Sequence, residues 1–203
     1  RYIWMLFIAA LTFGCTQQAA ENEEVNSQNN EKEFSYLAEQ FADLKIIRYQ
    51  IPGFDRLTAK QKELVYHLTQ AGLEGRDIMW DQNYRHNLTI RKALENIVRN
   101  YNGDKESDDW KQFMVYMKRI WFSNGIHHHY STAKIMPEFS QDYFNELLMA
   151  TNTELDEEIV NVLFDESIDG KKVNLDPEKG LLKGSAINFY DPDITEEEVD
   201  AYY

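Results

Sequence analysis

The sequence contains a single cysteine, Cys15, among 203 residues. An internal disulfide is therefore impossible, and a cysteine-rich zinc finger is excluded. Basic residues are also scarce, because 21 lysines and arginines face 35 aspartates and glutamates, which gives a formal net charge of -14. This charge repels phosphates and no basic patch is visible, so we expect no nucleic-acid partner. A repeat of fixed period is missing as well.

The composition is that of a folded protein. Hydrophobic residues make up 43% of the sequence and aromatic residues 13%. A chain of 203 residues with this content is long enough to build one sizeable core or two small ones. We therefore expect a globular region rather than a disordered chain.

The amino-terminal residues have the pattern of an export signal. An apolar run occupies residues 3–13, with Arg1 before it and Gly14, Cys15 and polar residues after it. Such a run is short for a bilayer span and is typical of a secretory signal. Leu11–Cys15 resembles the lipobox of bacterial lipoproteins, although its leucine lies four residues before the cysteine instead of three.

The lipobox resemblance makes residues 1–15 a signal segment and Cys15 the site of lipidation. It implies an exported protein, anchored to a membrane only through a lipid, in the periplasm or at the surface of a bacterial cell. The alternative is an amino-terminal membrane helix with a buried cysteine. Residues 16–32 are rich in Gln, Asn and Glu, so we expect a flexible polar tether there.

Both ends of the sequence predict a longer protein. The first residue is Arg1 rather than methionine, so we expect part of the signal to be missing. Thr195–Glu198 has the pattern of a capping box, in which the hydroxyl and the carboxylate satisfy free amides at a helix start. Only residues 199–203 follow, without a glycine or basic turn to end that helix. Residues 33–203 are therefore expected to form an incomplete, mainly helical amino-terminal lobe.

Helical periodicity dominates the region after the tether. Residues 34–43 place Phe34, Leu37, Ala38 and Phe41 on one helical face, and residues 44–51 fit a short strand or extended segment. Further helices are expected from apolar positions at helical spacing and from their caps. The signals are Thr58 with Leu64, Val65, Leu68 and Ala71 up to Gly72 or Gly75; Ile90, Leu94, Ile97, Val98 and Tyr101 up to Asn102–Gly103; Ser107 with Trp110, Phe113, Met114, Met117, Ile120 and Trp121 up to Gly125; Ser140 with Tyr143, Phe144, Leu147 and Leu148; and Thr153–Glu157 leading into Ile159, Val162 and Leu163.

These patterns predict an α+β fold that is predominantly α-helical, with a few short strands. A turn-rich loop is expected over residues 169–177.

Three consecutive histidines, His127–His129, lie in a loop between Gly125 and Pro137. Two metal ligands on one helix face need a spacing of three or four residues, so adjacent histidines do not favour a metal site. His67 is expected at the edge of the core and His86 at a helix start. The loop offers imidazoles, a phenol and backbone groups to a ligand, which allows a binding site, a metal site or a plain connection.

Several segments resemble the dipeptidyl peptidase III family of zinc peptidases. The Tyr66-His67-Leu68 run matches a Tyr-His-Leu in the first long helix of that family. The resemblance covers most of the sequence after the tether, namely Leu57–Gly75, Trp110–Gly125, Tyr130–Pro137 with Gly125, Lys134 and Pro137 in register, Lys179–Tyr190 and the helix at Thr195. The family's Asn-Tyr and Ser-Phe-Gly of this loop are replaced by Ile126-His127 and His129-Tyr130-Ser131.

The resemblance implies part of the non-zinc lobe of a two-lobed exopeptidase that releases dipeptides from the amino terminus of oligopeptides. In such an enzyme zinc polarises the scissile carbonyl, and a glutamate acts as general base. The family's zinc motifs, His-Glu-x-x-Gly-His and Glu-Glu-x-Arg, are absent here, so both functions are expected beyond residue 203 and this chain alone is expected to be inactive. By position Tyr130 is implied to contact the substrate, with His129, Asn124 and Gly125 behind it.

Two alternatives remain open. One is a non-catalytic lipoprotein whose helical domain binds peptides or a partner protein through the same loop. The other is a structural helical domain in which the histidines are incidental.

Overall fold

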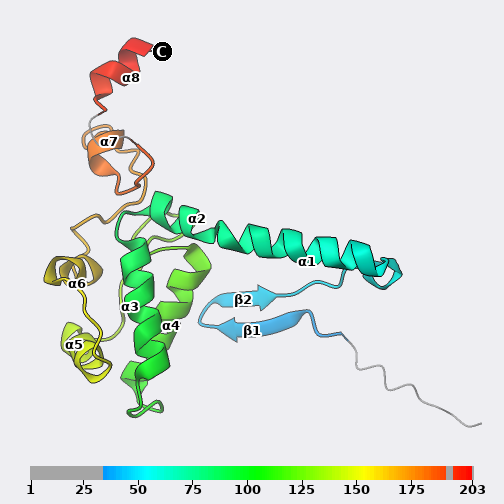
Figure 1. Ribbon diagram of the computed structural model, residues 1–203. Coiled ribbons are helices and arrows are strands. Elements are labelled where there is room, and N and C mark those ends of the chain that lie inside the picture. Colours follow the sequence, from blue (N-terminus) through cyan, green and yellow to red (C-terminus); the bar gives the residue numbers. More distant parts are fainter. Residues whose placement is uncertain (1–33, 191–193, 203) are drawn as a thin grey trace, which may run out of the picture. The chain divides into compact units, whose positions relative to one another are not determined.

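The computed structural model describes residues 34–190 and 194–202 (Figure 1). The predicted export signal, the lipobox with Cys15, the tether over residues 16–32 and the alternative membrane helix all lie outside these residues. Within the described ranges, no helix is both long enough and apolar enough to cross a membrane.

The described residues are predominantly α-helical and include a small sheet, which confirms the predicted α+β class. In chain order the elements are β1 (Leu37–Phe41), β2 (Leu44–Ile47), the 3-10 helix η1 (Phe54–Arg56), α1 (Ala59–Glu74), α2 (Arg76–Asn83), α3 (Asn87–Asn100), α4 (Asp108–Ser123), α5 (Gln141–Ala150), α6 (Glu157–Phe164), α7 (Leu181–Gly184) and α8 (Glu196–Tyr202).

The helix starts follow the predicted caps. Thr58 Oγ1 accepts a hydrogen bond from Gln61 N, and the Gln61 side chain accepts one from Thr58 N, so a complete capping box opens α1. Ser107 caps α4 and Ser140 caps α5 in the same way, each accepting from the backbone amide three residues on. Thr195 forms the predicted box with the Glu198 carboxylate. These contacts satisfy amides that a helix start otherwise leaves unpaired.

The predicted helix over residues 34–43 is wrong. Leu37–Phe41 is instead a strand that pairs antiparallel with Leu44–Ile47, with Phe41 opposite Leu44 and Leu37 opposite Ile47. The turn between the two strands is tight, and its residue Ala42 takes a positive φ of 46°. In so short a segment the spacing of apolar residues does not distinguish a helix from a strand. Hydrogen bonding to Leu44–Ile47 is what makes this segment a strand.

A second correction concerns α1, whose cap and end at Gly75 are as predicted. Its predicted apolar stripe is not buried, since Leu64 is 58% exposed and Leu68 63% exposed. His67 is exposed too, and does not lie at the edge of the core. The helical spacing of apolar residues therefore predicted the helix correctly, but it did not predict that this apolar face is exposed.

The end of α3 also differs from the prediction. The helix ends at Asn100, and its C-cap is Tyr101 in an extended conformation rather than Asn102–Gly103. The Tyr101 ring stacks on Trp110 of the next helix, with ring centroids 4.6 Å apart. This contact lies where the chain leaves the helix.

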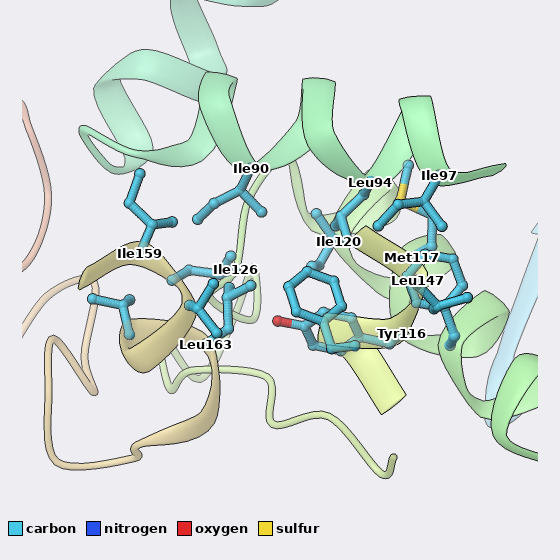
Figure 2. Close-up of a cluster of buried hydrophobic side chains, with 14 of the residues drawn as sticks. Ile90, Leu94, Ile97, Tyr116, Met117, Ile120, Ile126, Leu147, Ile159 and Leu163 are labelled. Atoms are coloured by element: carbon cyan, nitrogen blue, oxygen red, sulfur yellow. The ribbon is translucent and has the colours of Figure 1, made fainter. Parts of the chain in front are cut away.

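The core of the described residues from Leu37 onward is built mainly from α3, α4, α5 and α6. Figure 2 shows the side chains of α3 facing those of α4, with α6 and the start of the loop after α4 closing one end. Each fully buried aliphatic side chain contributes on the order of 1.5–3 kcal/mol. The residues labelled there are Ile90, Leu94, Ile97, Tyr116, Met117, Ile120, Ile126, Leu147, Ile159 and Leu163.

Candidate functional site

The loop over residues 124–137 begins with a sharp reversal at the end of α4. Asn124 adopts a left-handed conformation with φ 53°, and Gly125 follows with φ 147°. Gly125 N donates to the Ile120 carbonyl at 3.1 Å, which caps the helix. A positive φ disfavours residues with a Cβ atom, so the glycine suits this reversal.

Asn87 holds the base of the loop. This side chain is fully buried, and its Nδ2 donates to the Trp80 carbonyl at 3.0 Å while its Oδ1 accepts from Ile126 N at 3.1 Å. A Cβ on Gly125 would lie 2.2 Å from Asn87 Nδ2. One buried amide therefore joins α2, α3 and the loop, and it leaves room for nothing larger than glycine beside it.

The loop closes on itself through backbone hydrogen bonds. Ile135 N donates to the Ile126 carbonyl at 2.8 Å, and His128 N donates to the Ala133 carbonyl at 2.7 Å. Thr132 N donates back to the His128 carbonyl at 3.0 Å. Four residues, 128–131, are thereby held in a tight turn.

His127 is buried beneath this turn. Its Nε2 lies 2.7 Å from the Asp169 carbonyl oxygen, and its ring packs edge-on against Tyr84. Burial lowers the pKa of His127 to about 4, so the imidazole is neutral at pH 7 and Nε2–H is the donor to the carbonyl. The Asp169 carboxylate in turn accepts from Tyr84 Oη at 2.6 Å and from Arg85 at 3.1 Å. His127 thus fastens the loop to the segment after α6.

Lys134 provides a second buried anchor. It is 7% exposed, and its ammonium donates to the carbonyl oxygens of Val162, at 2.7 Å, and of Asp165 and Ile168. Burial lowers the pKa of Lys134, an effect that the nearby acidic groups oppose. A cation placed among the last carbonyls of a helix is favourable, which explains its position beside the end of α6.

The turn presents an aromatic surface, which we call the tip cluster: Phe122, His128, His129 and Tyr130. His128 and His129 stack with ring centroids 4.5 Å apart, His129 meets the edge of Phe122 at 5.0 Å, and Tyr130 lies 4.5 Å from His129. His128 Nδ1 accepts from the backbone amides of Tyr130 and Ser131, both at 3.2 Å, so its proton is on Nε2. Burial lowers the pKa of His129, which favours its neutral form.

The sequence-predicted site residues divide into two groups. Tyr130, which is 85% exposed, and His129 lie together in the tip cluster. Asn124 and Gly125 lie at the base of the loop, where Asn124 O accepts from Asn83 Nδ2 at 3.0 Å and Gly125 is buried. Their predicted contact with a substrate stays a prediction.

Three residues that position the loop were missed by sequence reasoning: Asn87, Lys134 and Asp169. Lys134 was noted only for its register with a known family. Their partners lie between 28 and 85 residues away in the cited hydrogen bonds, so no local pattern reveals them. A buried polar residue inside an apolar helix face, such as Asn87, was the one available signal.

The three adjacent histidines do not form a metal centre. His127 faces Asp169, His128 binds backbone amides, and His129 packs against Phe122. Across the described ranges, no three His, Cys, Asp or Glu side chains are grouped so that they could hold a metal ion.

Comparison with known proteins adds no assignment to this geometry. No protein-family model matches the sequence, and no curated protein matches it either.

Proposed function

We propose that this chain forms part of the peptide-binding wall of an exported zinc exopeptidase of the dipeptidyl peptidase III kind, which releases dipeptides from the amino terminus of oligopeptides. The segments that resemble this family include Trp110–Gly125 and Tyr130–Pro137, which contribute Phe122 and Tyr130 to the tip cluster. The zinc ligands and the general base would come from polypeptide outside these 203 residues.

The observation that carries the proposal is the presentation of Tyr130. The Tyr130 side chain is 85% exposed and therefore gains little from contacts with apolar side chains. Its turn is nevertheless held by three backbone hydrogen bonds and by two buried anchors, His127 and Lys134. The backbone that carries this side chain is therefore held in place before a ligand arrives, so little backbone freedom is lost on binding. This arrangement favours recognition over a plain connection.

The residues of the tip cluster would bind and orient a peptide. The Tyr130 ring offers an apolar face to a substrate side chain, and its hydroxyl offers a donor to a peptide carbonyl. His129 packs behind Tyr130 and limits its rotation. When a second lobe closes over the peptide, these rings exclude water from the bound segment.

The decisive experiment uses the intact protein. We expect it to contain zinc, to hydrolyse chromogenic dipeptide amides, and to lose this activity when treated with a chelator. Tyr130→Ala should raise KM by about 5- to 30-fold, the equivalent of one partly buried aromatic contact, and should leave the zinc content unchanged. Tyr49→Ala serves as the matched control, since Tyr49 is a 78% exposed tyrosine outside the loop.

Two results separate this proposal from a non-catalytic lipoprotein that binds peptides or a partner protein. Zinc-free protein that binds a peptide through Tyr130 without hydrolysing it would favour the binding protein. An unchanged KM for Tyr130→Ala in an active enzyme would contradict the role given to the tip cluster.

A further inference from the structure

A cavity of about 290 Å³ lies between α4 and the segment that follows the tip cluster. Gln112, Val115, Tyr116 and Arg119 line one wall, and they recur at the spacing of a single helix face. The volume is at the lower limit for ligand sites, so the cavity suits a small molecule rather than a long chain.

The opposite wall runs antiparallel to α4. His129 contacts Phe122 near the end of α4, whereas Phe139 contacts Phe113 and Tyr116 nearer its start. The turn closes between Ile126 and Ile135, so residues 135–139 are the ones that return along the helix. Arg119 and His128 both act on Asp43 and therefore lie at one end of the cavity, and we infer from the direction of the return that Glu138 lies toward Gln112 at the other.

The two ends of the cavity carry opposite charge. At one end are the Arg119 guanidinium and His128, whose Nδ1 is occupied by backbone amides and whose Nε2–H is left as a donor. At the other end is the Glu138 carboxylate, which forms no ion pair with the residues that the structure describes. Val115, Ile135 and Met136 make the stretch between them apolar.

The spacing of these charges selects the length of a ligand. Gln112 and Arg119 are seven residues apart, which is about 10 Å along a helix that rises 1.5 Å per residue. A free amino acid is too short to reach both ends, whereas two or three extended residues span about 7–10 Å. The net charge of -14 disfavours an anionic ligand, and the presence of both Arg119 and Glu138 favours a ligand that carries one charge of each sign.

We propose that this cavity binds a short zwitterionic peptide of two or three residues with an apolar side chain. Its carboxylate pairs with Arg119 and His128, its ammonium pairs with Glu138, and its side chain packs on Val115, Ile135 and Met136. This site is separate from Tyr130, and it does not rest on the peptidase activity proposed above.

Asp43 provides a way to separate ligand binding from structural support. Its Oδ1 lies 2.5 Å from Arg119 Nη2, so Arg119 also connects α4 with the turn of the β1–β2 hairpin. A hydrogen bond from the backbone of Asp43, followed by the positive charge of Arg119, lowers the pKa of Asp43. A ligand carboxylate would share or compete for this guanidinium.

The test is isothermal titration calorimetry of the intact protein with the dipeptide Leu-Leu. This ligand contains no bond that an enzyme releasing dipeptides would cleave, so it stays intact during the titration. We expect Leu-Leu to bind, and acetylation of its amine, amidation of its carboxylate or use of free leucine to weaken binding by about tenfold or more. Arg119→Gln and Glu138→Gln should each weaken Leu-Leu binding by a similar factor. Arg99→Gln, at a 72% exposed arginine side chain on α3, should not change it.

Asp43→Asn removes the same ion pair as Arg119→Gln but keeps the guanidinium, so binding should be unchanged or tighter. Val115→Trp should block binding by filling the cavity, with the near-ultraviolet circular dichroism and melting temperature confirming that each variant is folded. Failure of Leu-Leu to bind, or equal weakening by Asp43→Asn and Arg119→Gln, would overturn the proposal. So would binding that Tyr130→Ala abolishes and Glu138→Gln leaves intact, since the peptide would then lie at the tip cluster.

Discussion

Replacing Gly125 by alanine tests how the loop is held. The new Cβ would lie 2.2 Å from Asn87 Nδ2 and 2.8 Å from its Cγ, so the buried amide must move. Movement breaks its hydrogen bonds to Trp80 O and Ile126 N, and each buried group left unpaired costs about 1–3 kcal/mol. The positive φ of residue 125 adds about 1–3 kcal/mol of strain. We expect Gly125→Ala to lower the free energy of unfolding by about 3–9 kcal/mol, the sum of these contributions.

The same reasoning predicts that Gly125→Ala and Asn87→Ala are not additive. Asn87→Ala alone loses the two hydrogen bonds, for about 2–6 kcal/mol. In the double variant these bonds are lost once and the clash is gone, so only the backbone strain is added. The double variant should therefore be more stable, by about 2 kcal/mol or more, than the sum of the two single effects predicts.

Urea unfolding followed by fluorescence and circular dichroism measures all four proteins of this cycle. Gly72→Ala is the matched control, because a Cβ there meets nothing within 4 Å in the last turn of α1, and it should stabilise the protein by about 0.5–1 kcal/mol. Additivity within about 0.5 kcal/mol would refute the contact between Gly125 and Asn87.

Two further changes test the buried anchors of the loop. Lys134→Met leaves three carbonyl oxygens without their ammonium donor and should lower the free energy of unfolding in urea by about 2–4 kcal/mol. The control Lys92→Met, on the exposed surface of α3, should change it by less than about 0.5 kcal/mol. A loss below about 1 kcal/mol for Lys134→Met would contradict the anchoring role of Lys134. The pKa of His127 is about 4 in the folded protein and 6.5 in the unfolded chain. Between these pH values the unfolded chain binds more protons, so the free energy of unfolding falls by up to about 3 kcal/mol as the pH decreases from 6.5 to 4. His127→Gln should flatten this dependence and His67→Gln, at an exposed residue, should not; equal slopes would show that His127 is not buried in its neutral form.

Much of the helical framework could be predicted from local sequence. Thr58, Ser107 and Ser140 begin helices because each hydroxyl reaches an amide only three residues away, a contact that depends on no other element. The apolar positions of α3 and α4 likewise match the buried faces, because helical periodicity and burial agree there. Tyr130 and His129 were expected to lie together, since they are neighbours in one turn.

The candidate site itself depended on contacts that no local pattern contains. His127 and His129 have the same chemistry and differ by two positions, yet one is fastened to Asp169 and the other packs against Phe122. The environment of each ring is supplied by segments distant in sequence. For this reason three histidines that look alike in the sequence have separate partners in the fold.

Local patterns were enough to predict where the capped helices begin and which residues of α3 and α4 face the core. The strand at residues 37–41, the exposure of the apolar stripe of α1 and the anchoring of the loop by Asn87 and Lys134 became evident only in the folded chain. The physical reason is the range of the interactions. Caps and periodicity act within a few residues, whereas strand pairing, burial and the satisfaction of buried polar groups require partners that only the folded chain brings together.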